Sequence, residues 1–241
     1  MNLALLIPRR GILPDPLPPV AGDIPVVLLH GTVSSPGNFA LIAARLKDEG
    51  RRVIGVEFGH RGTDRLELCL LDIVTALERE LEPGQRFDIV GHSLGGLMGL
   101  RLAHLPGFAG RVRTLVGLGA CFRGQPVAWN PLVRALVTAV TGPSLVQLMC
   151  DAKIDAPIPE GVRVISIISD NDRVVDPSSS RIGEVRWVEG TSHTLLTKHA
   201  EEVAQALSDG ADEPHEIPAP EDAEQDLSAT GHETSPRVEK R

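Results

Sequence analysis

From Pro25 to about Leu207, short apolar runs alternate along the chain with segments whose apolar residues recur every three or four positions. A short apolar run bounded by turn residues predicts a strand, and the wider spacing predicts an amphipathic helix. The predicted strands are residues 25–29, 53–58, 87–90, 112–118, 162–169 and 185–188. The predicted helices are residues 39–49, 65–81, 93–105 and 197–207. Such alternation predicts an α/β protein with a doubly wound, mostly parallel sheet.

One insertion, at about residues 121–159, interrupts this alternation. Within it, Asn130 can cap a helix over residues 130–140 with Pro131 at the first helical position. The helix is apolar on nearly all sides, and a helix of this kind must be covered or must itself cover something. We interpret it as a short helical lid over an acyl pocket. The alternative is an ordinary core helix.

The two ends of the chain differ in composition from the domain between them, residues 23–208. Residues 1–22 hold five prolines, which predicts an extended leader lying on the domain surface. Residues 209–241 hold ten Asp and Glu against three Lys and Arg, and therefore carry −7 of the net charge of −8. We predict that this acidic tail is disordered. Because the other 208 residues carry 22 acids and 21 bases, no surface is basic enough for a nucleic-acid partner.

Several residue types exclude further classes of protein. The start, MNLALLIPRRG, has no basic residue before its short apolar run and no small-residue cleavage site, so we expect a cytoplasmic protein. No apolar run is long enough to span a membrane. The three cysteines, Cys69, Cys121 and Cys150, lack metal-ligand spacing, although a Cys121–Cys150 bridge stays open. We expect neither metal nor cofactor, and interpret Asp64, Asp72 and Asp88 as solvated or capping residues.

The strongest chemical signal is Gly91-His92-Ser93-Leu94-Gly95, directly after a predicted strand and directly before a predicted helix. In this context the serine lies on a cramped turn that exposes its hydroxyl, and the flanking glycines avoid clashes that any Cβ would cause. The helix N-terminus behind the serine favours developing negative charge. We predict that Ser93 is a nucleophile. The alternative is an ordinary Gly/Ser turn.

A nucleophilic serine needs a histidine base, which follows it in the chain in folds of this type. Before the tail, the candidates are His104, His193 and His199. His104 lies late in the helix that begins at Ser93 and therefore points away, and His199 is expected on a solvated face of the last helix. His193 lies in a loop between the last strand and the last helix, where it can reach over the serine. We predict His193 as the base, the alternative being a surface loop histidine.

The base needs an acid to orient it, and three aspartates follow the strand at residues 162–169. Asp176 precedes Pro177 and fits the cap of a short helix. Asp170 follows the strand immediately, whereas Asp172 lies two residues further on, where a carboxylate can reach sideways. The residues themselves leave Asp170 and Asp172 open.

The anionic intermediate of acyl transfer needs two backbone N–H donors. Leu94, the residue after the nucleophile, is expected to supply one of them. Thr32 is expected to supply the other, because Gly31 permits a sharp turn after the first strand that points the N–H of Thr32 inward. His30 is interpreted as a structural residue that bonds to the loop backbone.

Taken together, the segments PVVLLHGT, GHSLGG, SDNDRVVDP and GTSH resemble the bacterial triacylglycerol lipase and carboxylesterase branch of the α/β-hydrolase superfamily. The resemblance covers Pro25 to about Leu207. It implies the α/β-hydrolase fold and a triad of Ser93, Asp172 and His193, with Thr32 and Leu94 at the oxyanion hole. The pattern D-x-V-V-x-P falls on Asp172 and selects it over Asp170.

We therefore expect a carboxylesterase or small lipase that cleaves small-molecule or lipid esters through an acyl-enzyme on Ser93. Transient contact with a lipid surface is compatible with this expectation. Two other interpretations stay open. One keeps the triad but acts as a thioesterase or acyltransferase, and the other is a non-catalytic protein of the same fold that acts through its lid or acidic tail.

Overall fold

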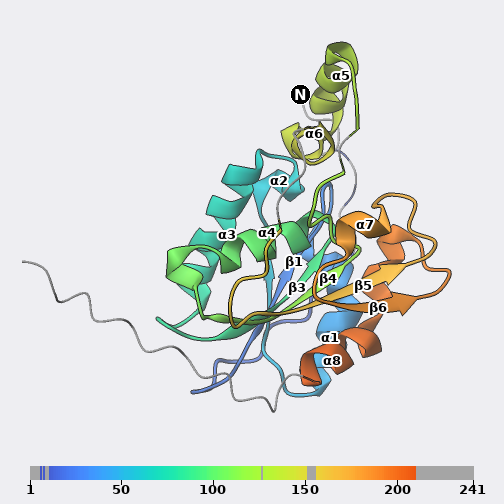
Figure 1. Cartoon of the computed structure of the whole chain (residues 1–241). Coiled ribbons are helices and arrows are strands. Elements are labelled where there is room, and N and C mark those ends of the chain that lie inside the picture. Colours follow the sequence, from blue (N-terminus) through green and yellow to red (C-terminus); the bar gives the residue numbers. More distant parts are fainter. Residues whose placement is uncertain (1–5, 7, 9–10, 126, 151–155, 210–241) are drawn as a thin grey trace, which may run out of the picture.

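The computed structural model describes residues 6, 8, 11–125, 127–150 and 156–209 (Figure 1). Six strands form one sheet in the order β2-β1-β3-β4-β5-β6, and every neighbouring pair is parallel. The strands are β1 (Val26–Leu29), β2 (Val53–Val56), β3 (Phe87–His92), β4 (Val112–Leu118), β5 (Arg163–Ser169) and β6 (Glu184–Val188). The predicted α/β class with a doubly wound parallel sheet is therefore confirmed.

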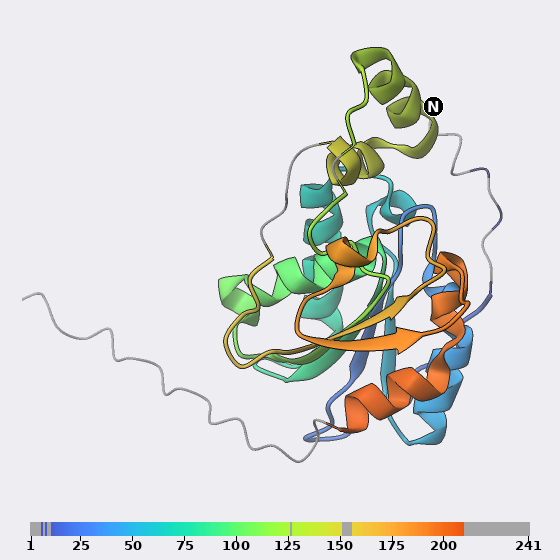
Figure 2. The same ribbon diagram turned by 45° about the vertical axis from the view of Figure 1, so that its right-hand side comes forward.

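Helices cover both faces of this sheet, because alternate side chains of a strand point to opposite faces. Val26 and Leu28 of β1 belong to one apolar cluster, and Val27 and Leu29 belong to the other. The first cluster lies under α1 (Ala40–Asp48) and α8 (Ala200–Ser208). The second lies under α3 (Leu66–Glu80) and α4 (Leu94–Ala103). Figure 2 shows the two helix pairs on opposite sides of the sheet.

The strand order reverses at β1, which fixes where a ligand can bind. From β1 the chain moves outward to β2 and then returns to β3 on the other side of β1. The loops after β1 and β3 therefore diverge at the carboxyl edge of the sheet, where α/β proteins bind their ligands. The register pairs Leu29 with Gly91 and His92 with Leu118, so the ends of β1, β3 and β4 lie side by side.

The element boundaries differ from the predicted ones mainly where short 3-10 turns replace helix ends. The helix predicted from residue 39 begins at Ala40, after the turn η2 (Pro36–Phe39). The helix predicted from residue 197 begins at Ala200, after the turn η4 (His193–Lys198). Short segments at α2 (Gly59–Gly62) and α7 (Pro177–Ser180) complete the domain.

The insertion forms two helices, α5 (Pro131–Thr141) and α6 (Pro143–Cys150), of which only α5 was predicted. Asn130 caps α5, accepting a hydrogen bond from the Val133 N–H at 2.9 Å. No residue of α5 is buried, Leu132 is 79% exposed, and the helix stands away from the sheet (Figure 1). The alternative of an ordinary core helix is therefore wrong. None of the helices in the described part of the chain has the length and apolar character that a bilayer span requires.

Candidate active site

Ser93 lies between the end of β3 and the first residue of α4, in a strained backbone conformation with φ 53° and ψ −117°. A non-glycine residue at positive φ is uncommon and frequently marks a functional site. The glycines beside it are required by packing. A Cβ on Gly91 would lie 2.5 Å from the backbone nitrogen of Gly96, and a Cβ on Gly95 would overlap the carbonyl oxygen of Leu29. The turn therefore presses helix α4 directly against the sheet and leaves Ser93 at its tip.

The structure brings His193 and Asp172 into contact. The His193 Nδ1–H donates to Asp172 Oδ2 at 2.7 Å, and the two side chains are 7% and 3% exposed. Asp172 Oδ1 accepts from the N–H groups of Val174 at 2.8 Å and Val175 at 2.9 Å. Burial alone would raise the pKa of Asp172, but the hydrogen bonds from His193 and these two amides hold the pKa below its ordinary value. The carboxylate therefore stays ionised and orients the imidazole.

The other two aspartates have different partners. Asp170 Oδ1 accepts from the Gly190 N–H at 2.7 Å, and Asp176 caps α7 by accepting from the Ser178 N–H at 2.8 Å. The capping interpretation of Asp176 is thus confirmed. Asp170 instead joins the end of β5 to the loop that carries His193, without touching the histidine.

Gly119, which follows β4, packs directly against the Asp172–His193 pair. A Cβ at Gly119 would lie 2.8 Å from Asp172 Oδ2 and 3.1 Å from His193 Nδ1, and the residue has a φ of +50°. Only glycine fits both the space and the backbone conformation. The end of β4 therefore limits the space around Asp172 and His193.

Ser93 and His193 line one cavity of about 550 Å³ at the carboxyl edge of the sheet. The apolar part of the cavity wall comes from Leu145, Leu148, Met149, Val174, Val175 and Leu195. The volume lies within the range typical of small-molecule sites. Helix α6, which sequence reasoning missed, supplies three of these side chains.

Thr32 and Leu94 lie beside Ser93, as two oxyanion donors would. Leu94 is the first residue of α4, so its N–H has no partner within the helix. A Cβ on Gly31 would lie 3.2 Å from the Cβ of Ser93, so the loop that carries Thr32 passes directly over the serine. Thr32 itself lines the cavity, and the next residue, Val33, has a φ of 58°.

Arg61 is a residue of this site that sequence reasoning missed. It lies in α2, where four successive residues have positive φ (Gly59 56°, His60 43°, Arg61 71°, Gly62 69°). The Arg61 side chain is buried and donates to the carbonyl oxygens of Val33 at 3.0 Å and Ser34 at 3.3 Å. The guanidinium thus holds the loop that follows Thr32. The only sequence signal was the pair of glycines flanking His60 and Arg61.

His92, between Gly91 and the nucleophile, is the second missed residue. Its Nε2–H donates to the backbone carbonyl of His193 at 3.0 Å, and the two ring centroids are 4.6 Å apart. Burial, together with the neighbouring His193, lowers the pKa of His92 to about 3. The ring is therefore neutral at any working pH and ties the loop of the base to the strand of the nucleophile.

The remaining histidines have structural partners. His30 bonds to the Gly31 carbonyl at 2.9 Å and stacks on Phe58, which confirms its structural interpretation. His104 reaches the carbonyl of Pro157 at 3.0 Å, away from Ser93. The expectation that His199 lies inside the last helix is wrong. It precedes α8 and bonds to Thr191 at 2.9 Å and to Glu202 at 3.0 Å, because η4 shortens the helix.

Cys121 also lines the cavity, and a thiol is a stronger nucleophile than a hydroxyl once it is ionised. Burial raises the pKa of its thiol to about 12, so it stays protonated and does not compete with Ser93. The thiol is free, and the side chain of its candidate bridge partner, Cys150, lies outside the described residues. Across the part of the chain that the structure describes, His, Cys, Asp and Glu nowhere gather in a group that could hold a metal ion.

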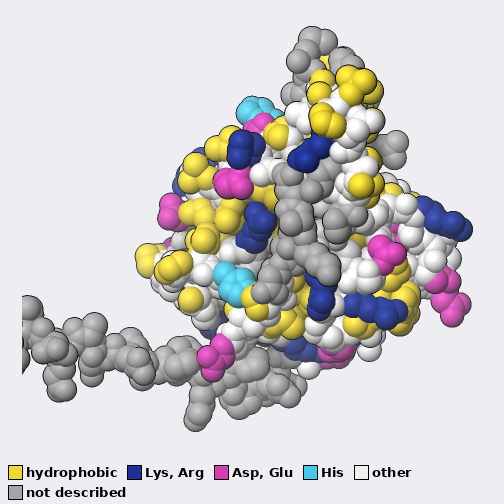
Figure 3. Space-filling view, turned by 45° about the horizontal axis from the view of Figure 1, so that its top comes forward, with side chains coloured by type: hydrophobic (Ala, Val, Ile, Leu, Met, Phe, Trp, Pro, Cys, Tyr) yellow, Lys and Arg dark blue, Asp and Glu magenta, His cyan; other side chains and the backbone are white. Residues whose placement is uncertain are grey.

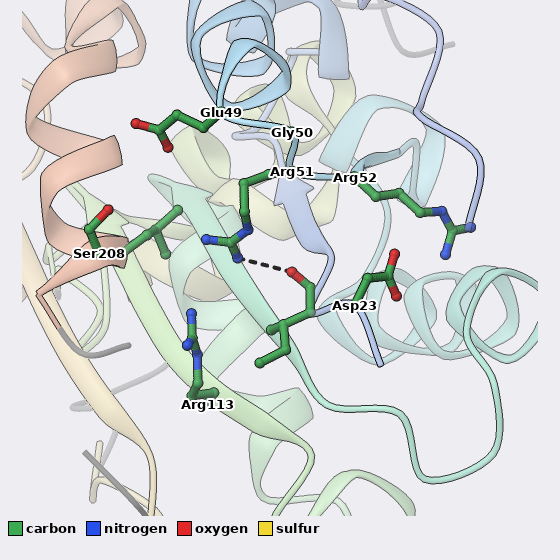
Figure 4. Close-up of a pocket in the computed structure, with 9 residues that line it drawn as sticks. Asp23, Glu49, Gly50, Arg51, Arg52, Arg113 and Ser208 are labelled. Carbon is green, nitrogen blue, oxygen red and sulfur yellow. Dashed lines mark hydrogen bonds between the residues drawn. The ribbon is translucent and has the colours of Figure 1, made fainter. Parts of the chain in front are cut away.

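A second cavity, of about 530 Å³, lies at the amino-terminal edge of the sheet, where Arg51 and Arg113 point toward one another (Figure 4). Both donate to Asp88, at 2.6 Å from Arg51 and at 2.9 and 2.5 Å from Arg113. Asp88 is fully buried, so its interpretation as a solvated or capping residue is wrong. The one hydroxyl in the wall, on Ser208, donates to the Ala204 carbonyl at 2.9 Å. This cavity is therefore built around an ion-pair network and lacks an activated nucleophile among its described residues.

Comparison with known proteins agrees with the fold. A model of the alpha/beta hydrolase family matches residues 26–144. An esterase from Rhodococcus superposes with a TM-score of 0.56 at 18% identity, covering 78% of this chain and 91% of its own. A methylesterase from Arabidopsis gives a TM-score of 0.57 at 16% identity, covering 77% and 99%. A bromoperoxidase from Bacillus anthracis gives a TM-score of 0.57 at 18% identity, covering 77% of this chain and 91% of its own. No curated protein matches the chain.

Proposed function

Because the chain belongs to the α/β-hydrolase superfamily, we propose that it is a serine hydrolase that cleaves carboxylic esters through an acyl-enzyme on Ser93. The observation that carries the proposal is the arrangement of one cavity. A serine on a strained strand-to-helix turn shares that cavity with a histidine whose Nδ1–H is held by a buried carboxylate. The structural neighbours are less than 20% identical to this chain, so they support only the fold. The proposal for the reaction therefore rests on the geometry of the site.

In the first half of the reaction, Ser93 Oγ attacks the ester carbonyl carbon while His193 Nε2 takes the hydroxyl proton. Asp172 keeps the proton of the imidazole on Nδ1 and stabilises the imidazolium that forms. The N–H groups of Thr32 and Leu94 bind the oxyanion of the tetrahedral intermediate. Collapse of the intermediate breaks the ester C–O bond, and His193 returns the proton to the leaving alcohol. Water activated by His193 then hydrolyses the acyl-enzyme in the same way.

The cavity wall supports an uncharged ester with an apolar acyl group as the substrate. Aliphatic side chains of α6 and of the loop after β5 form much of the wall. Burial of methylene groups against such side chains is worth about 0.8 kcal/mol each. The cavity therefore favours esters with longer apolar acyl groups over esters with charged ones.

Helix α5 supports contact with lipid esters at a surface. Leu132 and Leu136 are 79% and 64% exposed, and α5 leads directly into α6, which lines the cavity. Figure 3 shows exposed apolar side chains gathered on the part of the molecule that projects from the domain. Exposed apolar patches of this kind mark interaction sites. We propose that α5 acts as a lid that makes transient contact with lipid.

The test of the function is hydrolysis of p-nitrophenyl esters by the wild-type chain and by Ser93→Ala, with Ser208→Ala as the matched control. Loss of a triad nucleophile has cost on the order of 10⁶ in turnover in another hydrolase. We expect Ser93→Ala to lose activity and labelling by a fluorophosphonate, and Ser208→Ala to keep both, because Ser208 is exposed and lies outside this cavity. If Ser93→Ala retained more than about a hundredth of the rate, the nucleophile would lie elsewhere.

A further inference from the structure

The proline-rich leader lies outside the region that the family model matches, yet it contributes to the cavity that holds Ser93 and His193. The family match begins at Val26, whereas Pro8 and Gly11 line this cavity. The cavity wall therefore contains a part that the family pattern does not encode.

Two contacts hold the described part of the leader against the domain. Leu13 is partly buried against the apolar cluster under α1 and α8, and a Cβ on Gly55 of β2 would overlap its side chain. Two residues further on, the Asp15 carbonyl accepts a hydrogen bond from Lys47 of α1 at 3.0 Å. The segment is thus fixed from Leu13 onward, and this fixes where the chain arrives at the cavity.

At Gly11 the leader lies directly against the turn η2. A Cβ on Gly11 would overlap the carbonyl oxygen of Gly37, and Gly37 lines the same cavity. Gly11 also has a φ of +71°, a conformation that residues with side chains rarely adopt. The leader can pass so close to η2 at the rim of the cavity because residue 11 is a glycine.

Ile12, the described neighbour of Gly11, does little to hold the leader against the domain. Ile12 is 89% exposed, so its side chain adds almost no apolar burial to the contact. A segment with few buried contacts can be displaced at low free-energy cost. The leader at Gly11 can therefore move away from the rim without disturbing the core, because the nearest residue that attaches the leader to the core is Leu13.

We infer that the leader at Gly11 is a wall of the active-site cavity that restricts the size of the ester it accepts. The inference rests on the proposed esterase function and extends it to substrate selection. Displacement of this wall lengthens the space available to the substrate while Ser93, His193 and Asp172 keep their positions.

The experiment compares Gly11→Val with Gly22→Val in the full-length chain. Both glycines belong to the leader and have positive φ (71° and 79°), but a Cβ on Gly22 meets nothing within 4 Å. The two substitutions thus introduce a similar backbone strain, and only the one at Gly11 forces the leader away from η2. The measured quantity is kcat/KM for p-nitrophenyl esters from acetate to dodecanoate, together with the melting temperature.

We expect Gly11→Val to raise the ratio of dodecanoate to acetate activity by about tenfold or more, since each added methylene in an apolar site discriminates at that scale. Gly22→Val, which adds a similar strain without the clash, should keep the wild-type ratio, the wild-type activity on acetate and the wild-type melting temperature. An unchanged ratio in Gly11→Val, or the same change in both variants, would overturn the inference while leaving the esterase function intact. If the wild-type chain hydrolysed no ester at all, the proposed function would fail, and the inference with it.

Discussion

Replacement of Asp172 by asparagine tests the orientation of His193 most directly. The Asp172 carboxylate uses both oxygens, Oδ2 for the His193 Nδ1–H at 2.7 Å and Oδ1 for two backbone N–H groups at 2.8 and 2.9 Å. Asparagine has one acceptor oxygen and one donor NH₂ group. If the oxygen keeps the two backbone donors, the NH₂ group faces His193.

That orientation reverses the tautomer of the base. His193 Nδ1 then has to accept a hydrogen bond, so its proton moves to Nε2, which can no longer take the proton of Ser93. The equivalent change in a well-studied serine protease lowered turnover about 10⁴-fold. We expect a loss of similar size here, equivalent to about 5 kcal/mol of transition-state stabilisation.

Asp170→Asn is the matched control. Asp170 Oδ1 accepts from the Gly190 N–H at 2.7 Å, and the amide oxygen of asparagine can accept the same bond. We expect this variant to lose about tenfold or less. The assay is kcat for p-nitrophenyl butyrate near pH 7, with circular dichroism to verify folding of both variants. A greater loss for Asp170→Asn than for Asp172→Asn would refute the assignment of Asp172 as the orienting acid.

Three further predictions follow from individual contacts. Gly119→Ala should lower kcat by about 10²-fold with little change in KM, because its Cβ displaces Asp172 and His193; wild-type kcat would contradict this. Leu136→Ser should reduce hydrolysis of octanoate far more than of acetate at an unchanged melting temperature, because the side chain is 64% exposed; equal losses on both esters would remove the proposed lid role. His92→Phe should make folding less sensitive to acid. Since burial and His193 lower the pKa of His92 from 6.5 to about 3, the folded chain binds fewer protons than the unfolded chain between these values. Its free energy of unfolding therefore falls as the pH drops, and urea unfolding at pH 6.5 and 4.5 should show this fall reduced by roughly 2 kcal/mol in the variant; parallel curves would contradict the assignment.

Residues close together in the sequence determined much of the fold and part of the candidate site. Strand and helix periodicity predicted the parallel sheet, because burial of an apolar stripe depends on local spacing. The glycines around Ser93 predicted a cramped turn, and the backbone of Ser93 is strained as expected. Asn130 and Asp176 were correctly predicted as caps, since a cap bonds to an amide two or three residues away.

Only the tertiary structure decided which distant residues meet. The chemistry of the residues left Asp170 and Asp172 open, and only the family pattern favoured Asp172. In the structure, the loop after β5, held by the Val174 and Val175 amides, directs Asp172 to His193. His92 contacts a residue 101 positions away, and Arg61 reaches a loop 27 and 28 positions away.

The same reason explains the two errors of interpretation and the missed wall of the cavity. Asp88 looked like a surface residue because nothing in the neighbouring sequence revealed that Arg51, from the loop before β2, and Arg113, from β4, would converge on it. His199 left the last helix because η4 took up the preceding residues. Gly11 gave no local signal of its contact with Gly37. Local periodicity fixes what each segment becomes, whereas the register of the parallel strands fixes which segment ends meet at the carboxyl edge of the sheet.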